Sequence, residues 1–209
     1  RIRKKCIERA EVEKDINFSD GSYRRYDIYQ GTGAASNKRV YHVDCFDEEA
    51  MQFKTNELFA KICSNFYGGK DDYSVHVQVY ERHQYHPIPV RGFHIDTFEL
   101  STFKIFLYLS DVNLEDGPTS YILYTHNDAE LRRMKKEVWG PVRSMGFKKE
   151  IDPHPTNFLP NELGEERLKN WVRVLGGKGT VFLFDTWGIH CGADVEQNGD
   201  RHVLINYYR

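Results

Sequence analysis

The sequence lacks the cysteine spacing of a zinc module or of a disulfide-stapled fold. Four cysteines occur in 209 residues, and no two of them form a Cys-x-x-Cys pair: Cys6, Cys45, Cys63 and Cys191. Both kinds of module depend on closely spaced cysteines, so the sequence argues against them. We expect all four cysteines to be reduced thiols.

Long apolar runs and a strong excess of one charge are also missing. No stretch approaches the roughly 18 apolar residues of a membrane-spanning helix, and the segment Arg1–Cys6 is too polar for the apolar part of a signal peptide. The formal net charge of −2 creates no general basic field that would attract a phosphate backbone, although a local basic patch stays open. We therefore expect a soluble cytoplasmic protein that binds neither membranes nor nucleic acid.

The composition fits one domain with a sizeable core. Apolar residues make up 40% of the chain and aromatic residues 14%. A chain of 209 residues with this composition has enough apolar side chains for a single core, and a second full domain is not expected. The expected domain covers residues 1–209.

A His-x-Asp pair is the most informative motif of the sequence. Residues two apart in a strand point to the same face, so His94 and Asp96 can present an imidazole and a carboxylate to one metal ion while Ile95 packs on the other side. The sequence contains nine histidines, so one such pair also arises by chance and is weak evidence by itself.

Two downstream residues strengthen this interpretation. His190 follows a second strand-like run and offers another imidazole, and Arg201 opens the strand-like run that ends at Tyr208. Two imidazoles and one carboxylate leave three coordination positions open, which is the arrangement of non-haem Fe(II) oxygenases. The planar guanidinium of Arg201 suits the distal carboxylate of 2-oxoglutarate. We predict His94, Asp96 and His190 as metal ligands and catalytic centre.

Further segments complete a family pattern around these residues: Phe103–Val112, Glu115–Pro118, Phe184–Gly192 and Asn206–Tyr208. Over residues 91–126 and 176–209 the chain resembles the phytanoyl-CoA dioxygenase-like branch of the Fe(II)/2-oxoglutarate oxygenases. Two positions depart from that branch: Tyr124–His126 replaces a frequent Gly-Ser-His ending, and Trp187 replaces a frequent basic residue. Both departures bear on the substrate class rather than on iron binding.

The resemblance implies a mainly β fold, a double-stranded β-helix or jelly-roll, with N-terminal and inserted helices packed outside. It also implies Fe(II), 2-oxoglutarate and O2 as cofactor and co-substrates. Decarboxylation of 2-oxoglutarate to succinate and CO2 would be coupled to hydroxylation of an unactivated C–H bond. The expected partner is a small-molecule substrate.

Two rival classes stay open beside the oxygenase. The chain fits a cupin-like metal enzyme that uses no 2-oxoglutarate, or a jelly-roll binding protein without catalysis. The complete set of three ligand residues argues against the second class. Formation of succinate separates the three classes.

Two more polar residues are candidates for the co-substrate site. Lys104 interrupts the apolar run Phe103–Leu109, where an unpaired ammonium group would be costly to bury. It lies either on a solvent-exposed face or beside an anionic partner inside, and the resemblance favours contact with 2-oxoglutarate. The run 74–80 places Gln78 and Tyr80 on its polar face, which either lines a cavity or meets solvent. We assign Lys104 and Gln78 to the co-substrate.

Other candidate ligands are assigned to the surface or to packing. His83 and His86 are three apart in an expected turn, without a carboxylate partner nearby in the sequence, and are expected at the surface. Cys191 adjoins His190. Because adjacent strand residues point to opposite faces, Cys191 is expected to pack rather than to bind metal.

Three helices and a long loop are expected outside the β core. Apolar periodicity and capping residues predict helices over residues 47–66, 127–138 and 160–175. Residues 127–175 form an expected insertion between the two halves of the family pattern. Its proline-spaced part, residues 139–161, is hypothesised to be a lid over the metal pocket, with a solvated surface loop as the alternative.

Overall fold

The computed structural model describes two β-sheets and the helices around them. The described residues are 1–12, 16–17, 23–24, 38–66, 69, 75–85, 92–96, 103–127, 129, 157–158 and 160–208. His86, most of the helix expected over residues 127–138 and most of the hypothesised lid, residues 139–161, lie outside this part of the chain.

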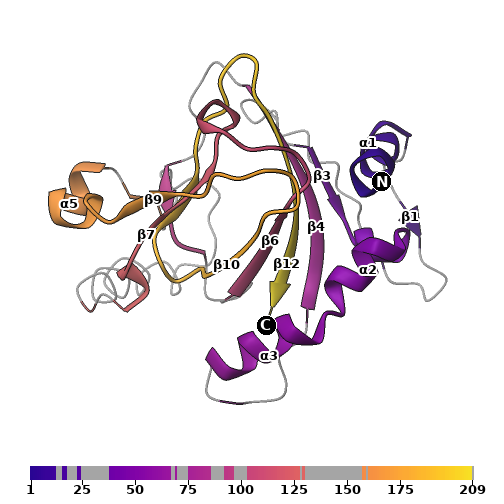
Figure 1. Ribbon diagram of the computed structural model, residues 1–209, viewed down its shortest axis with the longest axis horizontal. Coiled ribbons are helices and arrows are strands. Elements are labelled where there is room, and N and C mark those ends of the chain that lie inside the picture. Colours follow the sequence, from indigo (N-terminus) through magenta and orange to yellow (C-terminus); the bar gives the residue numbers. More distant parts are fainter. Residues whose placement is uncertain are drawn as a thin grey trace.

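Two five-stranded antiparallel sheets form the core of the fold (Figure 1). The first sheet has the order β10 (Val181–Asp185), β6 (Phe103–Tyr108), β12 (Asp200–Tyr208), β4 (Val75–Gln84) and β3 (Lys38–Tyr41). The second sheet has the order β8 (Asn157–Phe158), β5 (Phe93–His94), β11 (His190–Gly192), β7 (Thr119–Ile122) and β9 (Trp171–Arg173). A separate pair consists of β1 (Ile16–Asn17) and β2 (Tyr23–Arg24). The expectation of a mainly β fold with flanking helices holds.

Helices cover one face of the first sheet. The described α-helices are α1 (Ile2–Val12), α2 (Glu48–Lys54), α3 (Glu57–Phe66) and α5 (Pro160–Leu168), and the 3₁₀ turns are η1 (Val43–Cys45), η2 (Leu114–Asp116) and η3 (Thr125–Asn127). Figure 1 shows α1 and α2 beside β3 and β4, with α5 on the opposite side of the molecule next to β9. Side chains of α1 and α2 pack with Tyr80 and Leu204 in one hydrophobic cluster.

Strand alternation gives the first sheet two buried faces. On β12, Leu204 packs against the helices, whereas Val203 and Ile205 pack with Phe106 and Tyr108 in a different cluster. The Tyr108 hydroxyl donates to the carbonyl of residue 174 beside β9, at 2.9 Å, so this second face meets the other sheet. We call the face toward the helices the outer face and the face toward the second sheet the inner face.

The helix expected over residues 47–66 is two helices. Asp47 caps α2 by accepting a hydrogen bond from the Ala50 backbone N–H at 3.0 Å. Asn56 then accepts from the Leu58 backbone N–H at 3.0 Å. An asparagine side chain that bonds to the backbone ahead of it favours a helix start over a helix interior. Apolar periodicity continues through this break, so periodicity alone did not reveal it.

The helix expected over residues 160–175 ends early, and its last part is a strand. Trp171 pairs with Ile122 and Arg173 pairs with Ser120, which places β9 at the edge of the second sheet. Aromatic and β-branched residues at positions 171 and 172 fit a strand well. The expected insertion, residues 127–175, therefore includes an edge strand of the core.

Among the described residues, no helix combines the length and the apolar character that crossing a membrane requires.

Candidate metal centre

Two neighbouring strands bring the predicted ligands together. His190 of β11 lies directly opposite His94 of β5 in the antiparallel register, and the two ring centroids are 4.4 Å apart. Asp96 follows β5, where its backbone N–H donates to the Thr186 carbonyl at 3.1 Å. The Asp96 Oδ1 atom lies 3.9 Å from His94 Nε2 and 3.6 Å from His190 Nε2. All three ligand atoms lie within 4.8 Å of one another.

Both imidazoles are oriented by backbone carbonyls. His94 Nδ1 lies 3.1 Å from the Gly92 carbonyl, and His190 Nδ1 lies 2.9 Å from the Gly188 carbonyl. A carbonyl only accepts, so Nδ1 carries the proton in each ring and the Nε2 lone pair points toward Asp96. Second partners of this kind commonly fix the tautomer of metal-binding histidines.

The Nε2 atom of His190 supports a metal-binding role. This atom is buried, and within the described part of the chain it has no hydrogen-bond partner. A buried polar atom without a partner is costly unless something else satisfies it. Two imidazole nitrogens and a carboxylate oxygen suit a divalent transition metal, and these residues therefore fit Fe(II).

Gly188 has no room for a side chain. A Cβ atom at this position would collide with the Tyr121 hydroxyl group. That hydroxyl donates to the Asp185 carbonyl at 3.1 Å, which ties β7 to the end of β10. The carbonyl that orients His190 thus lies in a turn where only glycine fits.

Lys104 pairs with the predicted metal ligand Asp96. Its Nζ atom lies 2.5 Å from Asp96 Oδ2, the oxygen that is not shared with the two histidines. The ammonium group also lies 4.7 Å from the centre of the Tyr207 ring, where a cation–π contact is favourable. Of the two placements left open by the sequence, the structure has the buried one with an anionic partner. That partner is a protein carboxylate.

The charges around Asp96 keep its carboxylate ionised. Burial alone would raise the pKa of Asp96, but the positive charge of Lys104 lowers it below its usual value. Burial, and to a smaller extent the nearby His190, lowers the pKa of His94 to about 3. A neutral imidazole beside an ionised carboxylate is the protonation state that a metal ion requires.

Arg201 is buried at the start of β12. Only 2% of the residue is exposed. Its Nη1 atom donates to the Gly117 carbonyl and, at 3.4 Å, to Thr119 Oγ1. Gly117 has φ of 67°, and a Cβ there would collide with the Ala193 carbonyl, so the turn that receives the guanidinium needs glycine. Arg201 and Lys104 both lie on the inner face, toward opposite ends of it.

The structure does not bring Gln78 to this group. The side chain is fully buried on the outer face, where Nε2 donates to the Ala50 carbonyl at 2.8 Å and to Asn206 Oδ1 at 2.9 Å. Strand alternation correctly separated Gln78 from its valine neighbours. Gln78, however, lies on the face of β4 that the helices cover. Its side chain therefore links α2 to the sheet.

His83 is buried, contrary to the expectation of a surface residue. Its Nε2 lies 2.9 Å from Glu81 Oε2, and Arg39 Nε lies 2.7 Å from Glu81 Oε1. The carboxylate partner was present in the sequence two residues earlier on the same strand face. Cys191 packs in a hydrophobic cluster with Ile189, as expected, and burial raises the pKa of its thiol to about 11.

Sequence reasoning missed the two glycine carbonyls that orient the histidines. A repeated Gly-x-His pattern, at Gly92–His94 and Gly188–His190, was the available signal. It also missed Thr119, which the Gly-Pro turn carries to the guanidinium of Arg201.

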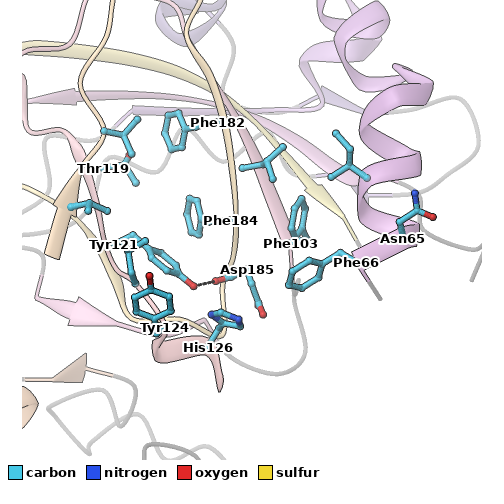
Figure 2. Close-up of a pocket in the computed structure, with 15 residues that line it drawn as sticks. Asn65, Phe66, Phe103, Thr119, Tyr121, Tyr124, His126, Phe182, Phe184 and Asp185 are labelled. Atoms are coloured by element: carbon cyan, nitrogen blue, oxygen red, sulfur yellow. Dashed lines mark hydrogen bonds between the residues drawn. The ribbon is translucent and has the colours of Figure 1, made fainter. Parts of the chain in front are cut away.

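Figure 2 shows a cavity of about 730 Å³ that residues of α3, β7, β9 and β10 line. Phe184, one of its lining residues, has its ring centroid 5.1 Å from that of His190. Thr119, another lining residue, accepts the hydrogen bond from Arg201. The cavity is thus adjacent to both the predicted metal ligands and the predicted co-substrate anchor.

Comparison of the sequence with known proteins gives no match to a family model and no match to a curated protein. Comparison of the structure gives many matches. The matched structures described below have low sequence identity to this chain, so they show a shared fold and nothing more.

Three of the similar solved structures illustrate the likeness. EvdMO1 aligns with a TM-score of 0.55 and 12% identity over 99% of this chain, which spans 42% of that protein. HygX from Streptomyces hygroscopicus, solved with nickel and 2-oxoglutarate bound, aligns with a TM-score of 0.56 and 13% identity over 99% of this chain and 77% of its own. The epimerase SnoN, solved with Fe3+, alpha ketoglutarate and nogalamycin RO, aligns with a TM-score of 0.59 and 11% identity over 99% of this chain and 72% of its own.

Proposed function

We propose that this chain is an Fe(II)- and 2-oxoglutarate-dependent dioxygenase that hydroxylates an unactivated C–H bond of a small-molecule substrate. The observation on which this proposal depends is the group of His94, Asp96 and His190, whose ligand atoms converge while His190 Nε2 stays buried without a hydrogen bond in the described part of the chain. HygX and SnoN, which share the fold, were solved with a metal ion and 2-oxoglutarate, and this supports the proposal.

The order of the strands supports a jelly-roll as the finer description of the fold. Strands β10, β6, β12 and β4 face strands β5, β11, β7 and β9, and each sheet combines strands that are distant in the sequence. Such interleaving of two antiparallel sheets is typical of a double-stranded β-helix. The proposed ligands come from β5, from the residues that follow it and from β11, which lie side by side in the second sheet.

Each residue has a separate task in the proposed reaction. Iron, when bound, supplies the activation of O2 that is coupled to decarboxylation of 2-oxoglutarate. His94, Asp96 and His190 would hold the ion. Lys104 pairs with Asp96 Oδ2, which would leave Oδ1 as the carboxylate oxygen that binds the ion. Arg201 offers a buried guanidinium to the distal carboxylate of 2-oxoglutarate.

The test is an anaerobic titration with Fe(II) followed by 2-oxoglutarate. Chelation of Fe(II) by 2-oxoglutarate is read from the visible charge-transfer absorption, and turnover in air is read as succinate. We expect Arg201→Leu to weaken 2-oxoglutarate binding at least about tenfold while Fe(II) binding persists, because a charge-assisted bidentate pair contributes about 1.5–3 kcal/mol. The exposed Arg173, which stacks on Trp171, provides the matched control Arg173→Leu.

The outcomes separate the proposed oxygenase from its rivals. Fe(II) binding without consumption of 2-oxoglutarate would favour a cupin-like metal enzyme of another kind. Absence of metal binding would favour a binding protein. Incorporation of one atom from isotopically labelled O2 into a product would establish hydroxylation as the reaction.

A further inference from the structure

Lys104 is a buried cation beside the candidate metal centre. Only 9% of the residue is exposed. In the strand register it lies between Phe184 of β10 and Tyr207 of β12. Its Nζ atom lies 2.5 Å from Asp96 Oδ2 and 4.7 Å from the centre of the Tyr207 ring. One carboxylate and two aromatic neighbours therefore hold the ammonium group in place.

The lysine cancels the charge of the ligand set. In the tautomer that the two backbone carbonyls favour, His94 and His190 are neutral imidazoles. Asp96 contributes one negative charge, and Lys104 contributes one positive charge at the other carboxylate oxygen. Without the lysine, the three ligands would carry one negative charge to attract a cation. With it, the four side chains together carry none.

Other charges on the inner face do not restore this negative charge. Among the described residues of the first sheet, the strand register places four further acidic or basic side chains on that face: Arg39, Glu81, His83 and Arg201. Arg39 Nε and Glu81 Oε1 form their own ion pair at 2.7 Å, and Glu81 Oε2 lies 2.9 Å from His83. Arg201 lies toward the opposite end of the face and is itself a cation. Lys104 is therefore the charge that acts most directly on the ligand carboxylate.

A fixed positive charge beside a metal ligand discriminates between ions of different charge. Coulomb repulsion is proportional to the charge of the ion, so the ammonium group disfavours a trivalent ion more than a divalent ion at the same position. Buried charges are screened by salt far less than exposed ones, so the effect persists at ordinary ionic strength. The ion pair with Lys104 also draws electron density from the carboxylate, which weakens its donation to a trivalent ion most. Both effects have the same sign.

We propose that Lys104 is a positioning residue that acts on the metal centre through Asp96. Its charge favours a divalent over a trivalent ion and so keeps bound iron in the ferrous state. In the one-electron couple, Fe(III) gains an electron to become Fe(II) while the protein ligands stay the same. This inference rests on the proposed function for the identity of the metal ion, whereas the preference between ion charges does not depend on 2-oxoglutarate.

The reduction potential of bound iron tests the proposal without turnover. The protein is loaded with Fe(II) under nitrogen, without 2-oxoglutarate, and titrated with redox mediators, and Fe(III) is read from its high-spin electron paramagnetic resonance signal. Lys104→Gln offers an N–H donor to Asp96 Oδ2 but removes the charge. We expect the ratio of Fe(III) to Fe(II) at a given potential to rise at least about tenfold in this variant. This corresponds to a fall in the reduction potential of about 59 mV or more.

A redox-free measurement and three further variants separate charge from shape. Mn(II), titrated calorimetrically into the metal-free protein, should bind at least about threefold more tightly to Lys104→Gln than to the unaltered protein. Lys104→Met, a second neutral variant, should match Lys104→Gln, whereas Lys104→Arg keeps the charge and should stay close to the unaltered protein.

Lys54→Gln is the matched control. Lys54 forms a comparable ion pair with the buried Asp44, at 2.6 Å, among the helices and turns outside the sheets. The substitution removes a paired lysine charge that has no contact with the metal ligands. It should change neither the reduction potential nor the Mn(II) affinity.

The outcomes separate this inference from the proposed function. An unchanged potential in both neutral variants would overturn the inference, as would a Lys104→Arg variant that behaves like them. Succinate formation is assayed on the same preparations. Iron binding with the expected shift but without succinate would overturn the proposed oxygenase and leave the role of Lys104 standing, and succinate formation with an unchanged potential would do the opposite. Failure of the unaltered protein and of every variant to bind Mn(II) or iron would overturn both.

Discussion

Two groups in this protein each combine a histidine with an aspartate, but they differ in how many ring nitrogens of the histidine are hydrogen-bonded. On the outer face, both ring nitrogens of His202 are hydrogen-bonded: Nδ1 lies 2.6 Å from the Tyr80 hydroxyl and Nε2 lies 3.0 Å from Asp200 Oδ2. Arg82 binds the same carboxylate with two hydrogen bonds, at 2.9 and 2.8 Å. We call His202, Asp200, Tyr80 and Arg82 the outer group.

In the metal centre, by contrast, the ring of His190 uses one nitrogen only. Its Nδ1 is held by a carbonyl, and its Nε2 is buried without a hydrogen bond in the described part of the chain. The difference is the one expected between a structural histidine and a metal ligand, the role proposed for His190. A structural histidine is saturated by protein atoms, whereas a metal ligand leaves one oriented nitrogen for the ion.

The largest expected effect is the loss of metal binding in His190→Ala. Removing one of three ligands leaves two, so Fe(II) affinity should fall by at least about 100-fold in an anaerobic titration. The unfolding free energy of the metal-free protein should fall by less than in His202→Ala, since only the Nδ1 hydrogen bond to the Gly188 carbonyl is lost. Wild-type Fe(II) affinity in this variant, and in the corresponding Asp96→Ala variant, would remove the basis of the comparison.

His202→Ala should have the reverse effect. The residue is fully buried, and its loss leaves the Tyr80 hydroxyl without its partner in the outer group. We expect the unfolding free energy to drop by about 2–4 kcal/mol in urea denaturation. Fe(II) affinity of the folded variant should equal that of the unaltered protein. A stable variant that binds Fe(II) weakly would show that the two groups are coupled through the sheet.

Gln78→Leu sharpens the comparison for a residue first assigned to the co-substrate. The change removes the donor to the Ala50 carbonyl and to Asn206, so the unfolding free energy should fall by about 1–3 kcal/mol. Affinity for 2-oxoglutarate should not change. Arg201→Leu serves as the comparison in the same titration. Weaker 2-oxoglutarate binding in a stably folded Gln78→Leu variant would show that Gln78 contributes to the co-substrate site.

The smallest expected effect is on the acid dependence of stability through Asp200. Burial acts to raise the pKa of Asp200, but hydrogen bonds from His202 and Arg82 lower it below its ordinary value of 3.8. The folded state then binds the proton less tightly than the unfolded state, so this stabilisation is present above about pH 3.8 and is lost as the pH falls below it. Asp200→Asn should therefore flatten the decline of the unfolding free energy at acid pH.

The control for the acid experiment is Glu165→Gln, at an exposed position of α5. It should leave the pH profile as it is in the unaltered protein. Equal slopes for Asp200→Asn and the unaltered protein below about pH 4 would mean that the ion pair with Arg82 contributes nothing to stability.

The group of His94, Asp96 and His190 was predicted partly from local strand spacing and partly from the family resemblance, and the structure brings the three side chains together. His94 and Asp96 share a strand face by their spacing of two, and His190 belongs to a motif with recognisable neighbours. The position of Lys104 in an apolar run left two placements open, a solvent-exposed face or an anionic partner inside, and the structure has the second. Its identity as Asp96 required the pairing of strands that lie far apart in the chain.

Long-range packing decided the features that the sequence left open or misplaced. Alternation in β4 separates two faces but does not say which one the helices cover, so Gln78 was placed on the wrong one. Residues Trp171–Arg173 continue a helical apolar pattern, yet pairing with β7 makes them a strand. His83 is buried rather than solvated because Glu81, two residues earlier on the same strand face, is its carboxylate partner.

Adjacent residues of β12 serve the two sides of the molecule: Arg201 points inward and His202 outward. A shift of this strand by one residue would exchange them, placing an imidazole where the guanidinium belongs and a permanent cation in the hydrophobic layer under α1. Pairing with β4 on one side and β6 on the other resists such a shift along the whole strand. The register of β12 therefore decides two things at once. It sets the packing of the helix layer, and it sets the position of the proposed co-substrate anchor.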